Sequence, residues 1–365
     1  MSRNRIIYQS ETIVTAPKEF SNGATGVNVV KVTEISTNTD IARRDVNVFG
    51  KLAAIDRIIL EEPKVGMDFS YYLVDGENEE NVGFSIDPST NFISGILSNA
   101  VGSERNYYIL LAPEGEDANT QTSGQMTGDR YVGIGNGFLS KYMLDLKVGE
   151  PPSVSVTVEG SNIEYGSISA TGTVENASID MTQSVPTKFT TDLVLPTIDV
   201  TGNNPVSVLR PGDLVLNFGA AQLDSGGVIL PGMGGNEAHV QSVSIEVPLS
   251  LKPQNRLGNT FSFSKQIDVP ITVTLSATAE MTDFSEGTLV DLICAANQER
   301  DISVTMYGTC GTGDPIMVFT LKGATLDSQS MKSSIGPNKT VDLKFSAQIG
   351  GSNDQDKGLF VSGSA

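Results

Sequence analysis

The sequence is poor in the residue types on which most enzyme and metal sites depend. Among 365 residues there are one histidine, His239, and two cysteines, Cys294 and Cys310, and there is no tryptophan. One histidine excludes a site built on several imidazoles, and two cysteines are too few for a disulfide framework or a cysteine-rich zinc site. The cysteines are either two buried reduced thiols or one bridge. Aromatic residues make up 6% of the chain, which leaves few candidates for a sugar-stacking platform.

Long apolar runs and an excess of basic charge are also absent. No run approaches the roughly twenty apolar residues of a membrane helix, and residues 1–11 lack the apolar centre of a signal peptide. We therefore expect synthesis in the cytoplasm and no membrane partner. The 24 Lys and Arg against 43 Asp and Glu give a net charge of −19 and no basic stripe that would hold phosphates. The acidity serves either solubility or a surface past which a polyanion moves without binding.

Two kinds of short motif suggest ligand sites but do not fit the known patterns. The glycine clusters at 133–137 and 232–235 lack the spacing and the Lys-Ser/Thr pair of a phosphate-binding loop, so we interpret them as loop glycines. The acidic stretches at 75–79 and 353–356 do not match the twelve-residue calcium loop, and we interpret them as solvated turns. The sequence thus predicts no catalytic residue, no cofactor and no metal site.

What the sequence does contain is the pattern of many short strands. Its 37 glycines and 16 prolines are spread between runs rich in Ser, Thr, Val and Ile. Residues 341–346 alternate strictly between apolar and polar side chains, which is typical of a half-buried strand, and residues 65–69 do the same. Helical spacing occurs only in short stretches, at 90–102 and 287–298. We predict an all-β fold with one or two short helices.

The order of these segments is repeated along the chain. Four pairs of stretches match at spacings that fall in order: 44–49 with 256–261 at 212, Pro63 with Pro270 at 207, 104–105 with 299–300 at 195, and 148–158 with 335–345 at 187. Chance alignment of two β-rich segments is the alternative to a duplication. We predict a first β domain with an N-terminal arm at 1–160 and a second at 236–365. Residues 161–235 are either a small inserted module or outer strands of the second domain.

Three segments resemble the tail tube (major tail) proteins of tailed bacteriophages. They are "RRDVNVFGKLAAIDRIILEEP", "MDFSYYLVDGENEENVGF" and the closing "LKGATLDSQSMKSSIGPNKTVDLKFSAQIGG", followed by "KGLFVSG". The resemblance is concentrated in residues 40–85 and 316–363. It consists of strands and turns and includes no catalytic motif.

The resemblance implies a structural protein of the virion tail, made in the cytoplasm of a host bacterium. Tail tube domains are β-sandwiches, or half-barrels, that close into a ring-shaped β-barrel on oligomerisation. Six domains form a ring, and stacked rings form the channel through which the genome leaves the capsid. A chain with two such domains would form trimeric, pseudo-hexameric rings, and a chain with one would form hexamers. The implied partners are further copies, the tape measure protein and other tail proteins, with double-stranded DNA as transiting cargo.

Residues of the first matched pair are the candidates for structural or interface roles. They are Arg44, Asn47, Phe49, Arg256, Asn259 and Phe261. A core position is the alternative for the two phenylalanines. Other assignments stay open: a baseplate, tail terminator or capsid decoration protein, a β-sandwich adhesin or carbohydrate-binding module, and, with the least support, a hydrolase on a β-scaffold.

Overall fold

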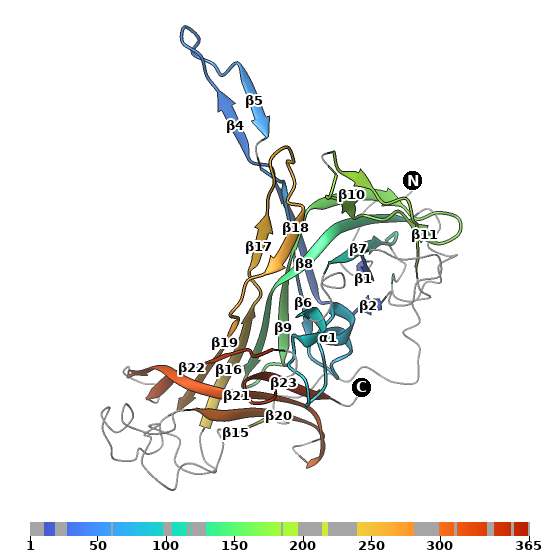
Figure 1. Ribbon diagram of the computed structural model, residues 1–365. Helices are drawn as coiled ribbons and strands as arrows, with labels where there is room; N and C mark the ends of the chain where they lie inside the picture. The colour runs from blue at the N-terminus through green and yellow to red at the C-terminus, as the bar shows by residue number, and fades with distance from the viewer. Residues whose placement is uncertain are drawn as a thin grey trace.

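A computed structural model of the chain describes residues 11–18, 28–59, 61–97, 104–114, 118, 129–183, 185–195, 214–217, 239–280, 299–309, 312–333, 339–351 and 354–363. Nearly all regular structure in these ranges is antiparallel strand, with two short helices, as the all-β prediction requires (Figure 1). Several expected features lie outside the described residues, namely the segment 287–298, Cys294, Cys310, Asn353 and the glycines at 232–235.

The elements fall into two groups along the chain. The first strand group comprises β1 (Glu11–Pro17), β2 (Asn28–Val30), β3 (Glu34–Asp40), β4 (Arg43–Val46), β5 (Asp56–Ile59), β6 (Lys64–Tyr72), α1 (Glu77–Val82), α2 (Ser94–Leu97), β7 (Arg105–Leu111), β8 (Arg130–Lys147), β9 (Ser153–Gly160) and β10 (Asn162–Ser167). Four short strands follow it: β11 (Thr173–Val174), β12 (Ile179–Asp180), β13 (Thr187–Lys188) and β14 (Leu193–Val194). The second strand group comprises β15 (Leu214–Asn217), β16 (His239–Pro248), β17 (Leu251–Gln254), β18 (Ser264–Ile267), β19 (Thr272–Glu280), β20 (Arg300–Thr309), β21 (Thr312–Lys332), β22 (Thr340–Gln348) and β23 (Gly358–Gly363).

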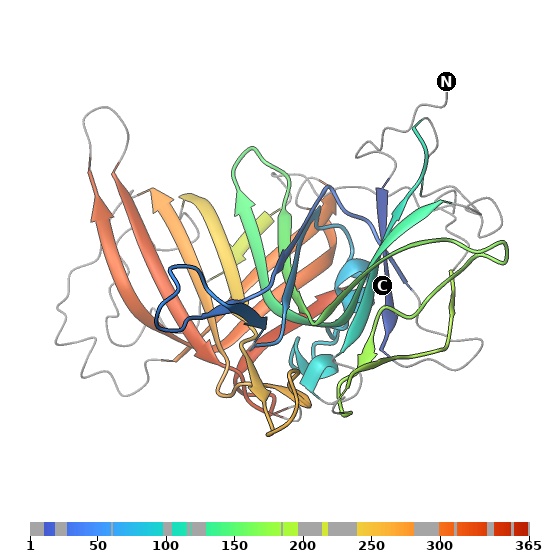
Figure 2. The same ribbon diagram turned by 90° about the horizontal axis from the view of Figure 1, so that it is seen from above.

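Both groups contribute to one continuous sheet, which we call the eight-strand sheet. Its order is β3-β6-β9-β8-β16-β19-β22-β21, where β8 contributes residues 138–147 and β21 contributes residues 325–332. Figure 2 shows β22, β19, β16 and β8 side by side in a curved array. Side chains alternate between a buried and an accessible face, for example in β9 and β19. The buried face packs in the main hydrophobic core, so the sequence period of two correctly predicted half-buried strands.

The long strands β8 and β21 each run on into a second sheet. The first half of β8 pairs with β7 and β10, and the first half of β21 pairs with β20 and β23. In both strands the pairing register shifts at the crossing point, between Leu139 and Lys141 and between Leu326 and Ser328. Because an extra residue at such a bulge bends and twists a strand, each long strand can belong to two sheets that face a common core.

The pairing pattern of the first strand group recurs in the second. When the strand registers of the two groups are compared, Leu139 is equivalent to Leu326 and Arg105 is equivalent to Arg300. These equivalences reproduce the sequence spacings of 187 and 195. In the hairpins β4–β5 and β17–β18, however, the registers make Arg43 equivalent to Leu251, which is a spacing of 208. The spacing of 212 read from the sequence is therefore wrong by four residues in this stretch. It matched Arg44 to Arg256, whereas β4 and β17 place Arg44 with Lys252. The spacing of 207 is wrong by one, because the registers of β6 and β19 equate Pro63 with Ile271.

The glycines at 133–137 lie within strand β8 and not in a loop, which corrects the sequence interpretation. Gly133 and Gly135 face the segment 168–195, which we call the outer segment and which packs on β1, β7 and β8 through a second apolar cluster. A methyl group at Gly135 would lie 2.0 Å from the carbonyl oxygen of Ala177, and one at Gly137 would lie 2.8 Å from the Tyr107 ring. These positions thus need glycine because another chain segment approaches the strand closely.

A buried polar network fixes the outer segment at this place. The Asn106 side chain donates to the Asn176 side chain at 3.0 Å, and the Ser178 hydroxyl donates back to Asn106 at 2.7 Å. The backbone N–H of Asn136 donates to the Ser178 hydroxyl at 2.8 Å. Since buried polar groups are costly unless they are paired, this network specifies one register for residues 176–178 on β7 and β8.

We expect Gly135→Ala to destabilise the protein strongly, because the new methyl group would push residues 176–178 away from β8 and break this network. The expected loss is about 2 kcal/mol of the free energy of unfolding, as for other overpacked sites. Chemical denaturation measures it. Gly351→Ala is the matched control, because no atom lies within 4 Å of the added methyl group. Equal stability of the two variants would contradict the close approach.

Candidate functional site: the open strand edges and the hairpins

The eight-strand sheet has two open edges in the described part of the chain. Strand β3 pairs only with β6, and residues 325–332 of β21 pair only with β22. Most side chains of both edges are exposed, and Ile35 and Leu326 are half-buried against the main core, whereas the strands between the edges have one fully buried face. Met331 is 49% exposed, whereas Leu144, the residue at the same register position in β8, is fully buried. An exposed, unpaired edge with an apolar side chain is a template for pairing with another strand.

The chain itself contains such a pairing, where the first strand group meets the second. Strand β16 pairs with residues 141–147 of β8, with Leu144 opposite Ile245. Strand β16 of the second group is equivalent to β3 of the first group. Residues 141–147 of β8 in the first group are likewise equivalent to the open edge of β21 in the second group. An ion pair of 2.8 Å between Lys141 and Glu246 adds to this junction. The junction therefore shows how an edge like β3 and an edge like residues 325–332 of β21 can pair with each other.

The accessible face of the eight-strand sheet is polar and carries more acid than base. It is rich in Ser and Thr, as in Ser153 and Ser155 of β9 and Thr274 and Ser276 of β19. Nine acidic side chains lie on this face, Glu34, Asp40, Asp68, Asp145, Glu159, Glu246, Glu280, Asp327 and Asp342, against the five basic side chains Lys64, Lys141, Lys147, Lys332 and Lys344. Among the large apolar side chains that are exposed in the described residues, Tyr72 of β6 lies on this face, and the balance of charge on the face is negative.

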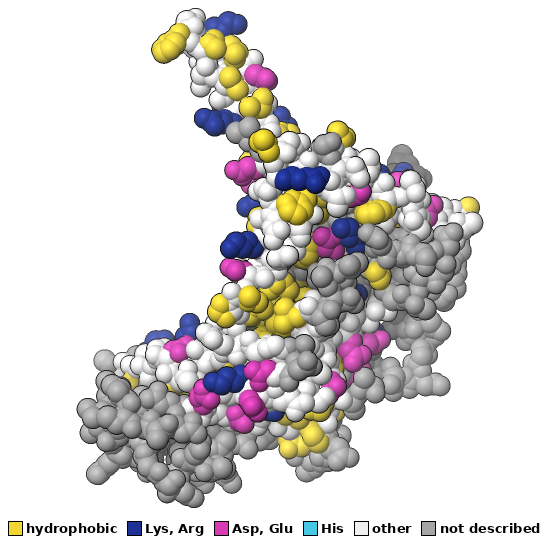
Figure 3. Space-filling model, in the orientation of Figure 1, with side chains coloured by type: hydrophobic (Ala, Val, Ile, Leu, Met, Phe, Trp, Pro, Cys, Tyr) yellow, Lys and Arg dark blue, Asp and Glu magenta, His cyan; other side chains and the backbone are white. Residues whose placement is uncertain are grey.

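The hairpins β4–β5 and β17–β18 carry the most exposed apolar side chains. Phe49 is 108% exposed and Leu257 is 105% exposed relative to a reference peptide, and each precedes a glycine with positive φ, Gly50 and Gly258. Figure 1 shows β4–β5 projecting beyond the rest of the chain, and apolar side chains gather at its tip in Figure 3. The core alternative for Phe49 is therefore wrong.

The six residues singled out in the sequence lie in these two hairpins. Arg44, Asn47 and Phe49 are exposed: Arg44 lies in β4 opposite Ile58 of β5, and Asn47 and Phe49 lie in the turn between the two strands. In β17–β18, the Arg256 guanidinium donates to the carbonyl of Thr182, and the Asn259 amide donates to Gln183 O at 3.3 Å. Phe261 is half-buried and is not the counterpart of Phe49, since the hairpin registers assign that position to Leu257.

Hairpin β17–β18 rests on the first strand group through a partly buried ion pair. The Lys265 ammonium lies 2.7 Å from the Glu62 carboxylate and 2.6 Å from the Ser161 hydroxyl, and Ser262 donates to Glu62 from its hydroxyl at 2.6 Å. Burial acts to raise the pKa of Glu62, but the Lys265 charge and these hydrogen bonds outweigh it and leave the pKa lowered. Sequence spacing missed this contact, because its partners are about a hundred residues or more apart.

Helix α1 corrects the interpretation of residues 75–79 as a solvated turn. Gly76 and Gly83, both with positive φ, flank it. Glu79 points inward, and its carboxylate accepts hydrogen bonds from Tyr71 at 2.9 Å and Tyr142 at 3.2 Å. Burial raises the pKa of Glu79 to about 7, although the two tyrosine hydroxyls act in the opposite direction. Glu79 is therefore a core residue and not a cation ligand.

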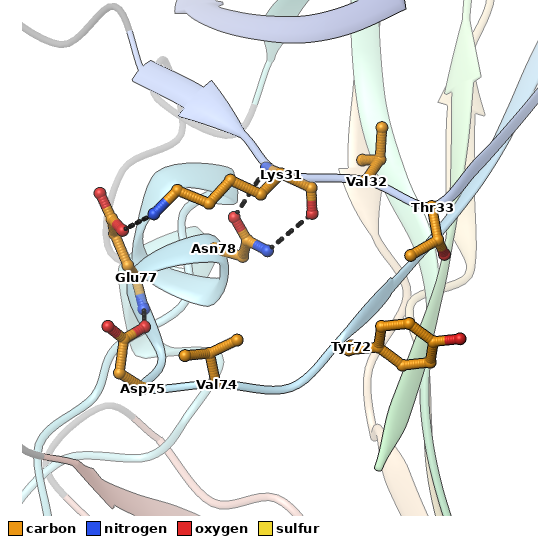
Figure 4. Close-up of a pocket in the computed structure, with 8 residues that line it drawn as sticks. All are labelled: Lys31, Val32, Thr33, Tyr72, Val74, Asp75, Glu77 and Asn78. Atoms are coloured by element: carbon orange, nitrogen blue, oxygen red, sulfur yellow. Dashed lines mark hydrogen bonds and ion pairs between the residues drawn. The ribbon is translucent and has the colours of Figure 1, made fainter. Parts of the chain in front are cut away.

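A pocket of about 130 Å³ lies beside α1, between residues 31–33 and the end of β6. Figure 4 shows its polar groups paired with one another: the Lys31 ammonium lies 2.9 Å from Glu77, and the Asn78 amide bridges the backbone N–H and C=O of Lys31 at 3.1 Å each. Ligand pockets usually enclose about 300 Å³ or more and present converging free polar groups. This pocket has neither feature.

Within the described ranges, no cluster of three or more His, Cys, Asp or Glu side chains has the arrangement of a metal site. Over the same residues, no helix is long and apolar enough to cross a membrane. His239 is the first residue of β16, and its side chain lies outside the described part of the structure. The features that stand out in the described residues are thus edges and hairpins rather than a cavity.

Comparisons with known proteins return two solved structures of interest. One is the sheath-tube complex, in its extended state, of an extracellular contractile injection system called PVC, with 11% identity and a TM-score of 0.28 over 45% of this chain and 96% of that chain. The other is the tube-terminating cap of the anti-feeding prophage, with 7% identity and a TM-score of 0.27 over 45% of this chain and 99% of that chain. No protein-family profile and no curated protein matches the chain. TM-scores this low do not establish a shared fold, so the function has to be inferred from the geometry of the chain itself.

Proposed function

We propose that the chain is a subunit of a phage-type tail tube, in which copies join edge to edge into rings and the rings stack into a channel. The observation that supports this most directly is the junction between β8 and β16. Transferred to two copies, the same pairing joins residues 325–332 of one copy to β3 of the next, with Met331 opposite Thr37 and Ser330 opposite Asn38. Pairing of this kind closes the edges that the isolated chain leaves open.

The ring would be built from three copies, because each copy supplies two strand groups with the same pairing pattern. We infer from this pattern that the chain arose by tandem duplication. The division into residues 1–160, 161–235 and 236–365 stays a prediction, and it would be refined at β10 (162–167), which pairs with β8.

The accessible face of the eight-strand sheet would line the channel. Its excess of carboxylates would repel the phosphates of double-stranded DNA and keep passing DNA from binding. The many serine and threonine side chains present no apolar patch to which a passing chain would adhere. The tape measure protein and other tail proteins are the remaining expected partners, and the virion tail is the expected location.

We expect the hairpin tips to contribute to stacking, and Phe49→Ser to shorten the tubes while leaving the rings intact. Burying a phenylalanine between rings is worth about 2 kcal/mol, or more than tenfold in the concentration at which tubes elongate. Tube length by electron microscopy measures this, with Leu257→Ser as the matching change in the second hairpin. Val185→Ser, which alters a 73% exposed valine in the outer segment, is the control. Tubes of unchanged length in the Phe49 and Leu257 variants would contradict a stacking role.

Negative-stain electron microscopy of the purified protein, with mass photometry on the same sample, tests the proposed function. Hollow tubes or stacked rings with a trimeric building block are expected. Hexameric rings would keep the tube but contradict the proposal that one chain fills two positions of the ring with its two strand groups. Rings that never stack would point to a cap or terminator, and a monomer at every concentration would contradict the proposal and favour an adhesin-like role.

A further inference from the structure

The two hairpins have the same register but different surroundings in the isolated chain. Hairpin β17–β18 is seated on Glu62 and Ser161 of the first strand group, as described above. Within the described residues, the side chains of hairpin β4–β5 contact one another, as in the ion pair between Arg57 and Asp45. Arg57 takes the position in β5 that Lys265 takes in β18. The seated hairpin therefore shows what a partner of the projecting hairpin has to provide.

The surface that would correspond to Glu62 and Ser161 exists once more, on the second strand group. The registers assign these positions to Pro270, in the link before β19, and to Gln348, at the end of β22. Both residues are exposed, and so are their neighbours Asp268 and Val269, with Val269 at 68%. An unoccupied copy of the hairpin seat thus lies next to the open edge of β21.

The chemistry of this surface matches hairpin β4–β5. Ile55, Ile58 and Ile59 on the hairpin are 48%, 38% and 43% exposed, and they would cover Val269 and Pro270. The guanidinium of Arg57 carries the charge opposite to that of Asp268. At the seat inside the chain the contact is instead polar, through Lys265, Ser262 and Glu62. The strand β5 of the hairpin without a seat in its own chain thus ends in the exposed Ile59, whereas the equivalent Ile267 of the seated hairpin is half-buried.

The geometry points to a lateral contact between copies, in which hairpin β4–β5 of one copy lies on the surface formed by residues 268–270 and Gln348 of the neighbouring copy. This inference rests on the proposed function, because the neighbour is the copy whose β21 edge pairs with β3. The contact would bring the base of each projecting hairpin against its neighbour within the ring. Only the tip around Phe49 would then extend beyond the ring.

Disulfide cross-linking tests the contact in a background in which Cys294 and Cys310 are serines. Arg57→Cys with Gln348→Cys should form a bond between copies, and only in protein that has assembled. The matched control, Arg57→Cys with Lys332→Cys, places the second thiol at the far end of the neighbour's sheet and should react at least about tenfold more slowly, because proximity sets the effective concentration. Ser161→Cys with Lys265→Cys should close within one chain and reports that the seat inside the chain is intact.

Each outcome bears on the inference. Rapid cross-linking of Arg57→Cys to Gln348→Cys between copies supports the lateral contact. In a second outcome, tubes form and Asn38→Cys cross-links to Ser330→Cys across the ring seam, but Arg57→Cys and Gln348→Cys cross-link no faster than their control pair. This result would overturn the lateral contact and leave the proposed function standing. Absence of assembly, with no cross-link at either place, would overturn both.

Discussion

Replacing Met331 with lysine is expected to abolish ring formation while leaving the monomer folded. Met331 lies on the open edge of β21 and would face Thr37 of the next copy. Lysine on an edge strand opposes pairing, since its charge would have to be desolvated at the seam. The concentration at which rings form should rise by more than tenfold, which corresponds to about 1.4 kcal/mol per tenfold step.

The same substitution should leave the stability of the monomer almost unchanged. Because Met331 is half-exposed in the isolated chain, its replacement should change the free energy of unfolding by no more than about 0.5 kcal/mol. Met331→Leu keeps the apolar edge and should assemble normally. Val194→Lys adds the same charge at a 55% exposed valine away from both edges, and it should also assemble. Normal rings from Met331→Lys would mean that this edge is not the seam.

The second large effect is a fall in stability as the pH rises, caused by Glu79. Its folded-state pKa of about 7 lies above the ordinary 4.5, so the folded protein holds a proton that the unfolded chain releases. The stabilisation is complete below pH 4.5 and is lost as the pH rises from there through 7. The loss amounts to ~3 kcal/mol, since each pKa unit corresponds to about 1.4 kcal/mol.

Glu79→Gln removes this titration. The glutamine carbonyl can still accept from Tyr71 and Tyr142, but the side chain never becomes an anion in the core. The variant should be more stable than the original chain at pH 8 and of similar stability at pH 4. Urea denaturation at both pH values measures the difference. The control is Glu77→Gln, an exposed position on the same helix, which should be nearly neutral at both. A pH dependence that survives Glu79→Gln would contradict the assignment to Glu79.

The strands and their repetition could be predicted from sequence because both are written in local patterns. The alternation at 341–346 predicted the buried face of β22, and the spacing of 187 extends to Leu139 and Leu326, which both precede the same bulge. The hairpins were misaligned because matching identical side chains favoured Arg44 with Arg256. The hairpin registers instead make Gly50 equivalent to Gly258. In both hairpins a large apolar residue precedes this glycine, Phe49 before Gly50 and Leu257 before Gly258, and this shared motif could have given the correct alignment.

The candidate site was harder to predict from the sequence, because the exposure of a side chain depends on which distant segments pack against it in the fold. Phe49 reads as a core residue, yet no described part of its own chain covers it. Gly135 reads as a loop residue, since nothing local reveals that Ala177 approaches it. Glu79 reads as one charge in an acidic run, and only the fold brings Tyr71 and Tyr142 to its carboxylate.

The most direct test of edge-to-edge assembly is disulfide mapping of the seam with Asn38→Cys and Ser330→Cys in one chain that lacks Cys294 and Cys310. Oxidation of the assembled protein should give a ladder on a non-reducing gel that ends at a closed covalent trimer, and a mixture of the two single variants should stop at dimers. Shifting the second cysteine to Ser328 should slow the reaction, because diagonal neighbours lie farther apart than directly opposed residues. Assembled tubes in which the Asn38 and Ser330 cysteines never join would contradict the account.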